Sequence, residues 1–215
     1  QFRAIVEHLK MVAHPQVRDV GSWAGNVMVA KTHPDFPSDI CLLLTLLDAK
    51  LTLLDGSLKT QELDMVSFLS DPSLPRTGPD AQIIHRVSIP YPKDNVFIET
   101  FKVMRRHMNA HAELNAGVSL EFSGAGMEIV SARIVFGNIS HGPFLASETC
   151  KELVGKELNS QNLSSARTVL EREIAANIRD ASVPDPPFVV VDRAYRQALA
   201  SNLLLKAGLR AIAAR

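Results

Sequence analysis

Apolar positions in the first third of the chain recur with the period of an amphipathic helix. The first segment has one hydrophobic face, made of Phe2, Ile5, Val6, Leu9 and Val12. This spacing predicts a helix over about residues 2–13, which Pro15 ends. The apolar run ICLLLTLLDA follows Ser38 and Asp39, which can cap it as a second helix. The stretch AKLTLLDGSLKTQEL then alternates around an Asp-Gly pair, and it predicts two short strands joined as a hairpin.

A polar segment rich in Pro and Gly separates this region from one with a different pattern. It reads SDPSLPRTGPD, residues 70–80, and predicts a connection between two units, one over 1–75 and one over 80–215. Beyond it we expect strands in AQIIHRVSIP, FIETFKVM, HAELNAGVSLEF and GMEIVSARIVFGNIS, paired as a small antiparallel sheet. The last third predicts helices in ASETCKEL, ARTVLEREIAANI and DRAYRQALASNLLLKAGLRAI. The expected fold class is therefore α+β.

Charge and composition exclude several classes of function. Lys plus Arg and Asp plus Glu each number 23, and no basic run with interleaved aromatic residues is present, so we expect no nucleic-acid partner. The longest apolar run is interrupted by Asp48 and Lys50 before the roughly 20 residues that a bilayer crossing needs, so no membrane span is expected. Cys41 and Cys150 lie far apart and indicate neither a disulfide framework nor a cysteine metal site. A cytoplasmic location is the default, and we expect that the chain, which starts at Gln1, begins inside a larger polypeptide.

The candidate chemistry lies mostly in one stretch of small residues, VGSWAGN. Its slim backbone predicts a turn that allows close approach of a ligand or of a packed helix. His107 and His111 stand four apart and could face one metal ion, but no third ligand is evident and we assign no metal site. The glycines of FSGAGMEI lie between two predicted strands and favour a hairpin turn. No nucleophile elbow, Walker loop or dinucleotide fingerprint is present.

Four segments, spread over about residues 12 to 206, follow one another in a known order. They are QVRDVGSWAGNV with a later Ser-Asp, VSIPYP with FKVMRR, ARIVFGNISHGPFLASETCKELVGK, and YRQALASNLLLKAG. They resemble, in that order, the R-N-x-[AG]-[ST]-[IL]-G-G-N run with its downstream S-D, the I-P strand with F-K-x-x-R-R, the F-G-G-x-x-x-x-P-x-x-A-x-x-x-E-x-x-L-x-G signature, and the Y-R-x-x-L-x-x-x-L-x-x-K helix. These motifs belong to the xanthine dehydrogenase, aldehyde oxidase and carbon monoxide dehydrogenase flavoprotein family.

The resemblance implies a fold and a cofactor. The family's domain has two lobes that hold FAD, followed by a small antiparallel three-stranded sheet packed with helices. This chain resembles the second lobe, over 1–75, and the C-terminal subdomain, over 80–215, whereas the first lobe, whose glycine loop holds the pyrophosphate, lies outside it. Three small or polar residues match the glycine run, where main-chain donors let the dinucleotide approach closely, and they are Ser22, Gly25 and Asn26.

Four further residues match positions that contact flavin in the family. Ser38 and Asp39 match the S-D pair, whose carboxylate accepts hydrogen bonds from flavin hydroxyls. Ile84 falls where an apolar residue packs beside the ring. Lys102 matches a lysine near the ring edge, where a cation stabilises negative charge on the reduced ring. No catalytic side chain is assigned, because the redox chemistry is that of the cofactor.

Two functions remain open at this point. The resemblance implies an FAD-binding module that passes electrons from iron–sulfur clusters to NAD or another external acceptor, with iron–sulfur and molybdopterin cofactors on partner domains or subunits. The alternative is a truncated flavin-domain fold that has lost FAD and serves as a structural or interaction subunit of a larger complex. The missing first lobe and the altered loop, with Ala24 in place of a family glycine and the longer segment KTHPDFP, favour the alternative. The retained Asn26, Asp39 and Lys102 favour the enzyme module.

Overall fold

In the described part of the chain, the fold contains two antiparallel sheets packed with helices. The computed structural model describes residues 2–74, 82–91, 93–124, 126–179 and 189–214. The elements run in the order α1 (Phe2–Lys10), α2 (Pro15–Val20), α3 (Trp23–Thr32), α4 (Asp39–Leu46), β1 (Lys50–Leu54), β2 (Thr60–Asp64), α5 (Met65–Ser70), β3 (Ile83–Ser88), β4 (Val96–Met104), β5 (Ala112–Phe122), β6 (Ile129–Phe136), β7 (Phe144–Leu145), α6 (Ser147–Leu153), α7 (Ser160–Asn177) and α8 (Arg193–Ala213). The expected α+β class is confirmed.

The first sheet has the strand order β2-β1-β3. Its β1–β2 hairpin is the predicted one, and its turn is held by the Asp55 side chain, which accepts hydrogen bonds from the backbone N–H groups of Ser57 and Lys59 at 2.8 and 2.9 Å. The expectation that β3 belongs to the later sheet is wrong, because β3 pairs antiparallel with β1. Sheet membership depends on pairing between distant segments, which strand periodicity does not encode. The predicted connection lies partly outside the described residues, at 75–80.

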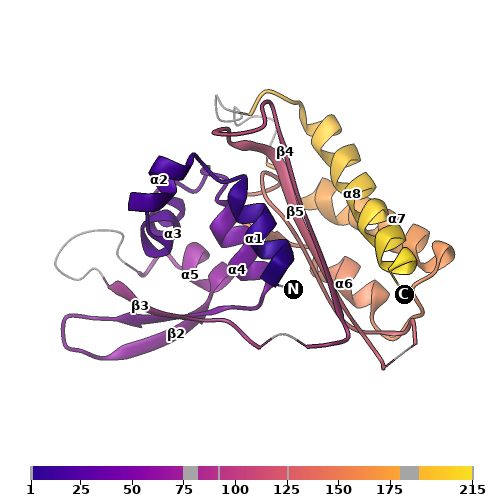
Figure 1. Cartoon of the computed structure of the whole chain (residues 1–215), viewed down its shortest axis with the longest axis horizontal. Helices are drawn as coiled ribbons and strands as arrows, with labels where there is room; N and C mark the ends of the chain where they lie inside the picture. The colour runs from indigo at the N-terminus through magenta and orange to yellow at the C-terminus, as the bar shows by residue number, and fades with distance from the viewer. Residues whose placement is uncertain (1, 75–81, 92, 125, 180–188, 215) are drawn as a thin grey trace.

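The second sheet has the order β4-β5-β6-β7, with three long strands and the two-residue β7. The β5–β6 pairing confirms the predicted hairpin around the glycines of FSGAGMEI. Helices α6, α7 and α8 pack on one face of this sheet, while α1 and α4 contact its other face. Figure 1 shows β4 and β5 standing between the N-terminal helices and the C-terminal helices. Strand β5 is consequently buried almost along its whole length.

Helix α4 joins the two sheets, and all of its eight residues are buried. A short apolar cluster from α1, α4 and β6 fills the contact, and its buried members are Ile5, Leu42, Leu43, Leu46 and Val135. Helix α4 approaches β5 closely because position 117 is glycine. A Cβ atom at Gly117 would lie 2.6 Å from Leu46 Cδ2. The first and second parts of the chain therefore share a continuous packed interface.

The segment before α4 differs from the expected turn and from the expected single helix. The first helix ends at Lys10, Ala13 has a positive φ of 52°, and Pro15 opens α2. The small residues that follow begin α3, because the Ser22 side chain accepts a hydrogen bond from the backbone N–H of Gly25. None of the helices in the described part of the chain combines the length and the apolar composition that a bilayer crossing requires.

Candidate functional site

An open cleft of about 720 Å³ lies where the N-terminal helices meet the β4–β5 loop, residues 105–111. Its volume is within the range of about 300–1,000 Å³ that is usual for small-molecule sites. The residues that line it come from both parts of the chain. They are Val12, Ala13, Val17, Asn26, Phe36, Pro37, Asp39, Lys102, Arg105, Arg106, Asn109, Ala110 and His111.

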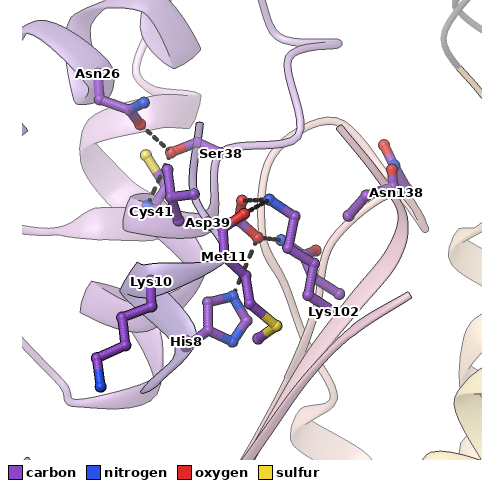
Figure 2. A network of polar contacts seen from close by, with 12 residues as sticks. His8, Lys10, Met11, Asn26, Ser38, Asp39, Cys41, Lys102 and Asn138 are labelled. Atoms are coloured by element: carbon purple, nitrogen blue, oxygen red, sulfur yellow. Dashed lines mark hydrogen bonds and ion pairs between the residues drawn. The ribbon is translucent and has the colours of Figure 1, made fainter. Parts of the chain in front are cut away.

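Asp39 stands at the centre of a buried polar network beside this cleft (Figure 2). It is the first residue of α4, where a carboxylate also interacts favourably with the helix dipole. Its Oδ1 accepts a hydrogen bond from Asn115 Nδ2 at 2.7 Å and lies 3.1 Å from His8 Nε2. Its Oδ2 accepts one from Lys102 Nζ at 2.7 Å. Three donors from three different elements therefore converge on one carboxylate.

Lys102 crosses from the second sheet to reach this carboxylate. It lies on β4, its side chain is only 2% exposed, and it also donates to the backbone carbonyl of Met11 at 3.0 Å. The ion pair thus connects β4 with α4 and with the end of α1. An ammonium group so buried needs these acceptors, because a charge without a partner is strongly disfavoured in a protein interior.

The electrostatics of the network favour an ionised Asp39. Burial by itself would raise the pKa of this carboxyl, but the hydrogen bond from His8 and the charge of Lys102 together hold the pKa of Asp39 below its ordinary value. His8 is fully buried, its Nε2 faces Asp39, and its Nδ1 has no hydrogen-bond partner. That arrangement fits an imidazole that donates from Nε2 to the carboxylate.

Gly137 makes the contact between Asn115 and Asp39 possible. A Cβ atom at position 137 would lie 1.9 Å from Asn115 Oδ1, so any side chain there would displace the amide. The backbone N–H of Gly137 also donates to the carbonyl of Asn115 at 2.9 Å. The glycine of the FGN sequence therefore serves the polar network through close packing.

Asn26 and Ser38 form a second, adjoining part of the network. The Ser38 hydroxyl donates to Asn26 Oδ1 at 2.5 Å and accepts from the backbone N–H of Cys41 at 3.0 Å, which caps α4. This bond ties α3 to the start of α4 and fixes the Asn26 amide at the wall of the cleft. The Asn-to-Ser-Asp spacing is long in this chain, yet the structure brings the three residues together.

The other predicted residues lie elsewhere. Ser22 and Gly25 form the N-terminal cap of α3 and are not among the residues that line the cleft. A Cβ atom at position 25 would lie 3.0 Å from Ser22 Oγ, so the local cap itself favours glycine there. Ile84 lies on β3 and packs against the core of the first sheet. Their roles toward a cofactor remain predictions.

Sequence reasoning missed His8 and Asn115, and it considered His111 only as a possible metal ligand. His8 occupies a position that is buried together with Ile5 on one face of α1, so a polar residue on an apolar face was the available signal. His111 lies beside Phe36, with ring centres 5.6 Å apart and planes at 87°. His107 lies within the β4–β5 loop and His111 is the last residue of that loop, so the two do not share a helical face. Within the described ranges no group of three His, Cys, Asp or Glu side chains could hold a metal ion.

Comparison with known protein families identifies the domain. Residues 1–92 match the FAD binding domain in molybdopterin dehydrogenase, and residues 99–211 match the CO dehydrogenase flavoprotein C-terminal domain. The chain belongs to the FAD-binding domains of the xanthine dehydrogenase, aldehyde oxidase and carbon monoxide dehydrogenase flavoprotein family. The resemblance seen in the motifs is thereby confirmed.

Individual relatives agree with this assignment. Aldehyde oxidase 4 of Mus musculus is 30% identical over 95% of this chain, and xanthine dehydrogenase/oxidase of Gallus gallus is 27% identical over 80% of it. The chain spans only 14% and 12% of the lengths of these two relatives. A solved structure of reconstituted CO dehydrogenase from Oligotropha carboxidovorans is similar with a TM-score of 0.75 and 26% identity, over 99% of this chain and 68% of that one.

The residues around the cleft fit a flavin, the cofactor of this family. Apolar side chains that line the cleft supply a surface for a flat ring, and the Asn26 amide lines the same cleft. An ionised carboxylate can accept about four hydrogen bonds. Asp39 receives two at Oδ1 and one at Oδ2, which leaves one acceptor position on Oδ2 for a ligand hydroxyl.

Proposed function

We propose that this chain is part of an FAD-dependent electron-transfer module in a molybdenum hydroxylase-type oxidoreductase. The module would receive electrons from iron–sulfur clusters and pass them to NAD or another external acceptor. The iron–sulfur and molybdopterin cofactors would lie on partner domains or subunits. The observation that carries the proposal is the cleft in which Asn26, Asp39 and Lys102 meet, since it lies between two regions that each match a flavoprotein family model.

The side chains of this domain would bind and orient, while bound FAD would supply the redox chemistry. Asn26 and Asp39 would hold ligand hydroxyl or amide groups, because both are fixed by hydrogen bonds before a ligand enters. Lys102 would keep the two cleft walls together through its ion pair with Asp39. Phe36 and the apolar residues near it would exclude water from one face of a ring.

The scaffold alternative gains no support from the same residues. That hypothesis expects Asp39 and Lys102 to be solvated surface charges, whereas both side chains are buried and bonded to each other. The cleft is also open and large enough for a ring. These observations favour the flavin module.

Filling the cleft with a large side chain tests the proposal. Ala110 lines the cleft from the β4–β5 loop, and Ala110→Trp should weaken FAD binding to the chain about tenfold or more, because it occupies the space of the ring. Ala176→Trp, at an exposed position on α7, is the matched control and should leave binding unchanged. Binding is measured by quenching of flavin fluorescence.

Equal saturable FAD binding by the Ala110→Trp and Ala176→Trp variants would contradict the proposal. We expect the FAD affinity of the unaltered chain itself to be low, because the glycine loop that holds the pyrophosphate in the family lies outside these residues. The direction of transfer requires a separate measurement on FAD-loaded protein. Stopped-flow reoxidation of the reduced flavin by NAD⁺, compared with ferricyanide, should show which class of acceptor the module uses.

A further inference from the structure

The charges that line the cleft do not balance. Among the described residues that line it, Asp39 carries the single carboxylate, and three side chains carry permanent positive charge, namely Lys102, Arg105 and Arg106. The Asp39 charge is already matched by Lys102 at 2.7 Å. The net charge of the cleft therefore comes from the two arginines of the β4–β5 loop.

These arginines are exposed and stand on a loop with a defined backbone. The Arg106 guanidinium donates from Nη2 and Nε to the backbone carbonyl of Asn109, at 2.5 and 3.0 Å. Asn109 itself has a positive φ of 52°, which turns the loop back toward β5. The position of the Arg106 group is thus set by the loop, while the rest of its planar fork remains available to an anion.

His111 lies at the end of the same loop, beside Phe36. Burial lowers its pKa, the charge of Lys102 lowers it further, and Asp39 opposes these effects only in part. Because Lys102 is already matched by Asp39, the preference of the cleft for an anionic ligand rests on Arg105 and Arg106.

The cleft combines this positive loop with an apolar wall that includes Val12, Val17, Phe36 and Pro37. We propose that Arg105 and Arg106 form an anion subsite for the phosphate of a nucleotide-type ligand whose flat ring lies on that wall. Guanidinium groups suit this task, because they bind phosphate oxygens through paired, charge-assisted hydrogen bonds. This inference rests on the proposed function in one respect, namely that the flat ring of the ligand lies on the apolar wall. The phosphate belongs either to the flavin or to a soluble acceptor.

Calorimetric titration of the 215-residue chain with inorganic pyrophosphate tests the subsite directly. The Arg105→Gln/Arg106→Gln variant should bind pyrophosphate about tenfold more weakly or worse, since each lost guanidinium removes charge-assisted hydrogen bonds. The control is Arg86→Gln, which removes one positive charge, half of what the double variant removes, from an exposed position on β3 outside the cleft. That variant should keep the affinity of the unaltered chain.

Flavin titrations of the same variants identify the source of the phosphate. If FMN and FAD weaken in the double variant while riboflavin does not, the subsite holds the phosphate of the flavin. If pyrophosphate weakens but FAD does not, the subsite serves a separate phosphate-bearing acceptor. Loss of FAD binding in the Ala110→Trp variant tests the proposed function independently of both.

The subsite is refuted if the unaltered chain shows no saturable pyrophosphate binding, or if the double variant and Arg86→Gln bind it equally. In either case FAD binding can still succeed, so the proposed function would survive. Conversely, arginine-dependent pyrophosphate binding together with equal FAD binding by the Ala110→Trp and Ala176→Trp variants would uphold the subsite and refute the flavin module.

Discussion

The ion pair between Asp39 and Lys102 should contribute a large coupling free energy to folding. Asp39→Asn keeps the size of the side chain and one oxygen that can accept from Asn115 and His8. It also removes the charge that balances Lys102 and directs an N–H group toward the ammonium. Lys102 would then keep only the carbonyl of Met11. Leaving one partner of a buried pair uncompensated destabilises a protein by about 3–5 kcal/mol.

The reciprocal variant should lose less unfolding free energy than Asp39→Asn. The double variant should lose less than the sum of the two single losses. Lys102→Met leaves Asp39 with two donors, His8 and Asn115, so we expect a loss of about 2–3 kcal/mol. Asp39→Asn/Lys102→Met removes both charges and leaves no buried ion without a partner. The double-mutant cycle should therefore give a coupling of about 2–3 kcal/mol.

Urea unfolding followed by circular dichroism measures each free energy of unfolding at neutral pH. The control cycle uses Glu148 and Lys151 on α6, an ion pair at 2.8 Å whose side chains are 63% and 73% exposed. That cycle should show no measurable coupling, because solvent screens the pair. The reasoning is refuted if the Asp39–Lys102 coupling is below about 0.5 kcal/mol, since the buried pair would then behave like a surface pair.

Two further predictions follow from the same interface. The pKa of Asp39 is lowered on folding, so its ionised carboxylate stabilises the folded state. This contribution is fully present above the unfolded pKa of about 3.9 and is lost as the pH falls through the folded pKa. Asp39→Asn should therefore lose less stability than the unaltered chain between about pH 5.5 and pH 3 in urea unfolding, and equal losses would contradict this assignment. Gly117→Ala should destabilise by about 1–3 kcal/mol, since the new methyl meets the buried Leu46 side chain. Gly56→Ala, where a Cβ atom has no neighbour within 4 Å, is the control, and equal thermal stabilities would contradict the packing argument.

Local patterns predicted most elements of this fold because the corresponding interactions are local. The hairpin around Asp55 depends on hydrogen bonds within a few residues, and the cap of α4 depends on Ser38 three positions before Cys41. Such contacts leave a signature in a short stretch of sequence. The membership of β3 in the first sheet was not predictable in this way, since it depends on pairing with β1 about thirty residues earlier.

The site was predicted in part, for a comparable reason. The motifs pointed to Asn26, Ser38, Asp39 and Lys102, which the structure brings together. Motif spacing could not show that Lys102 is bonded to Asp39, because that contact joins residues 63 positions apart. Phe2 and Val6, expected on the buried face of α1, are 50% and 49% exposed, while His8 is buried in order to reach Asp39. A polar interaction with a distant carboxylate therefore outweighs the simple apolar periodicity of that helix.

The dual position of Asp39, in the interface and in the cleft, decides how flavin-affinity measurements must be designed. Asp39→Asn would lower both the stability of the interface and the number of acceptors for a ligand hydroxyl, so weaker binding alone would not separate the two effects. In the Lys102→Met background the ion pair is already absent, while Asp39 still receives hydrogen bonds from His8 and Asn115. The difference in FAD affinity between Lys102→Met and Asp39→Asn/Lys102→Met then measures the contribution of the Asp39 carboxylate to FAD binding. A difference that persists while the two variants unfold at similar urea concentrations would place Asp39 in direct contact with the cofactor.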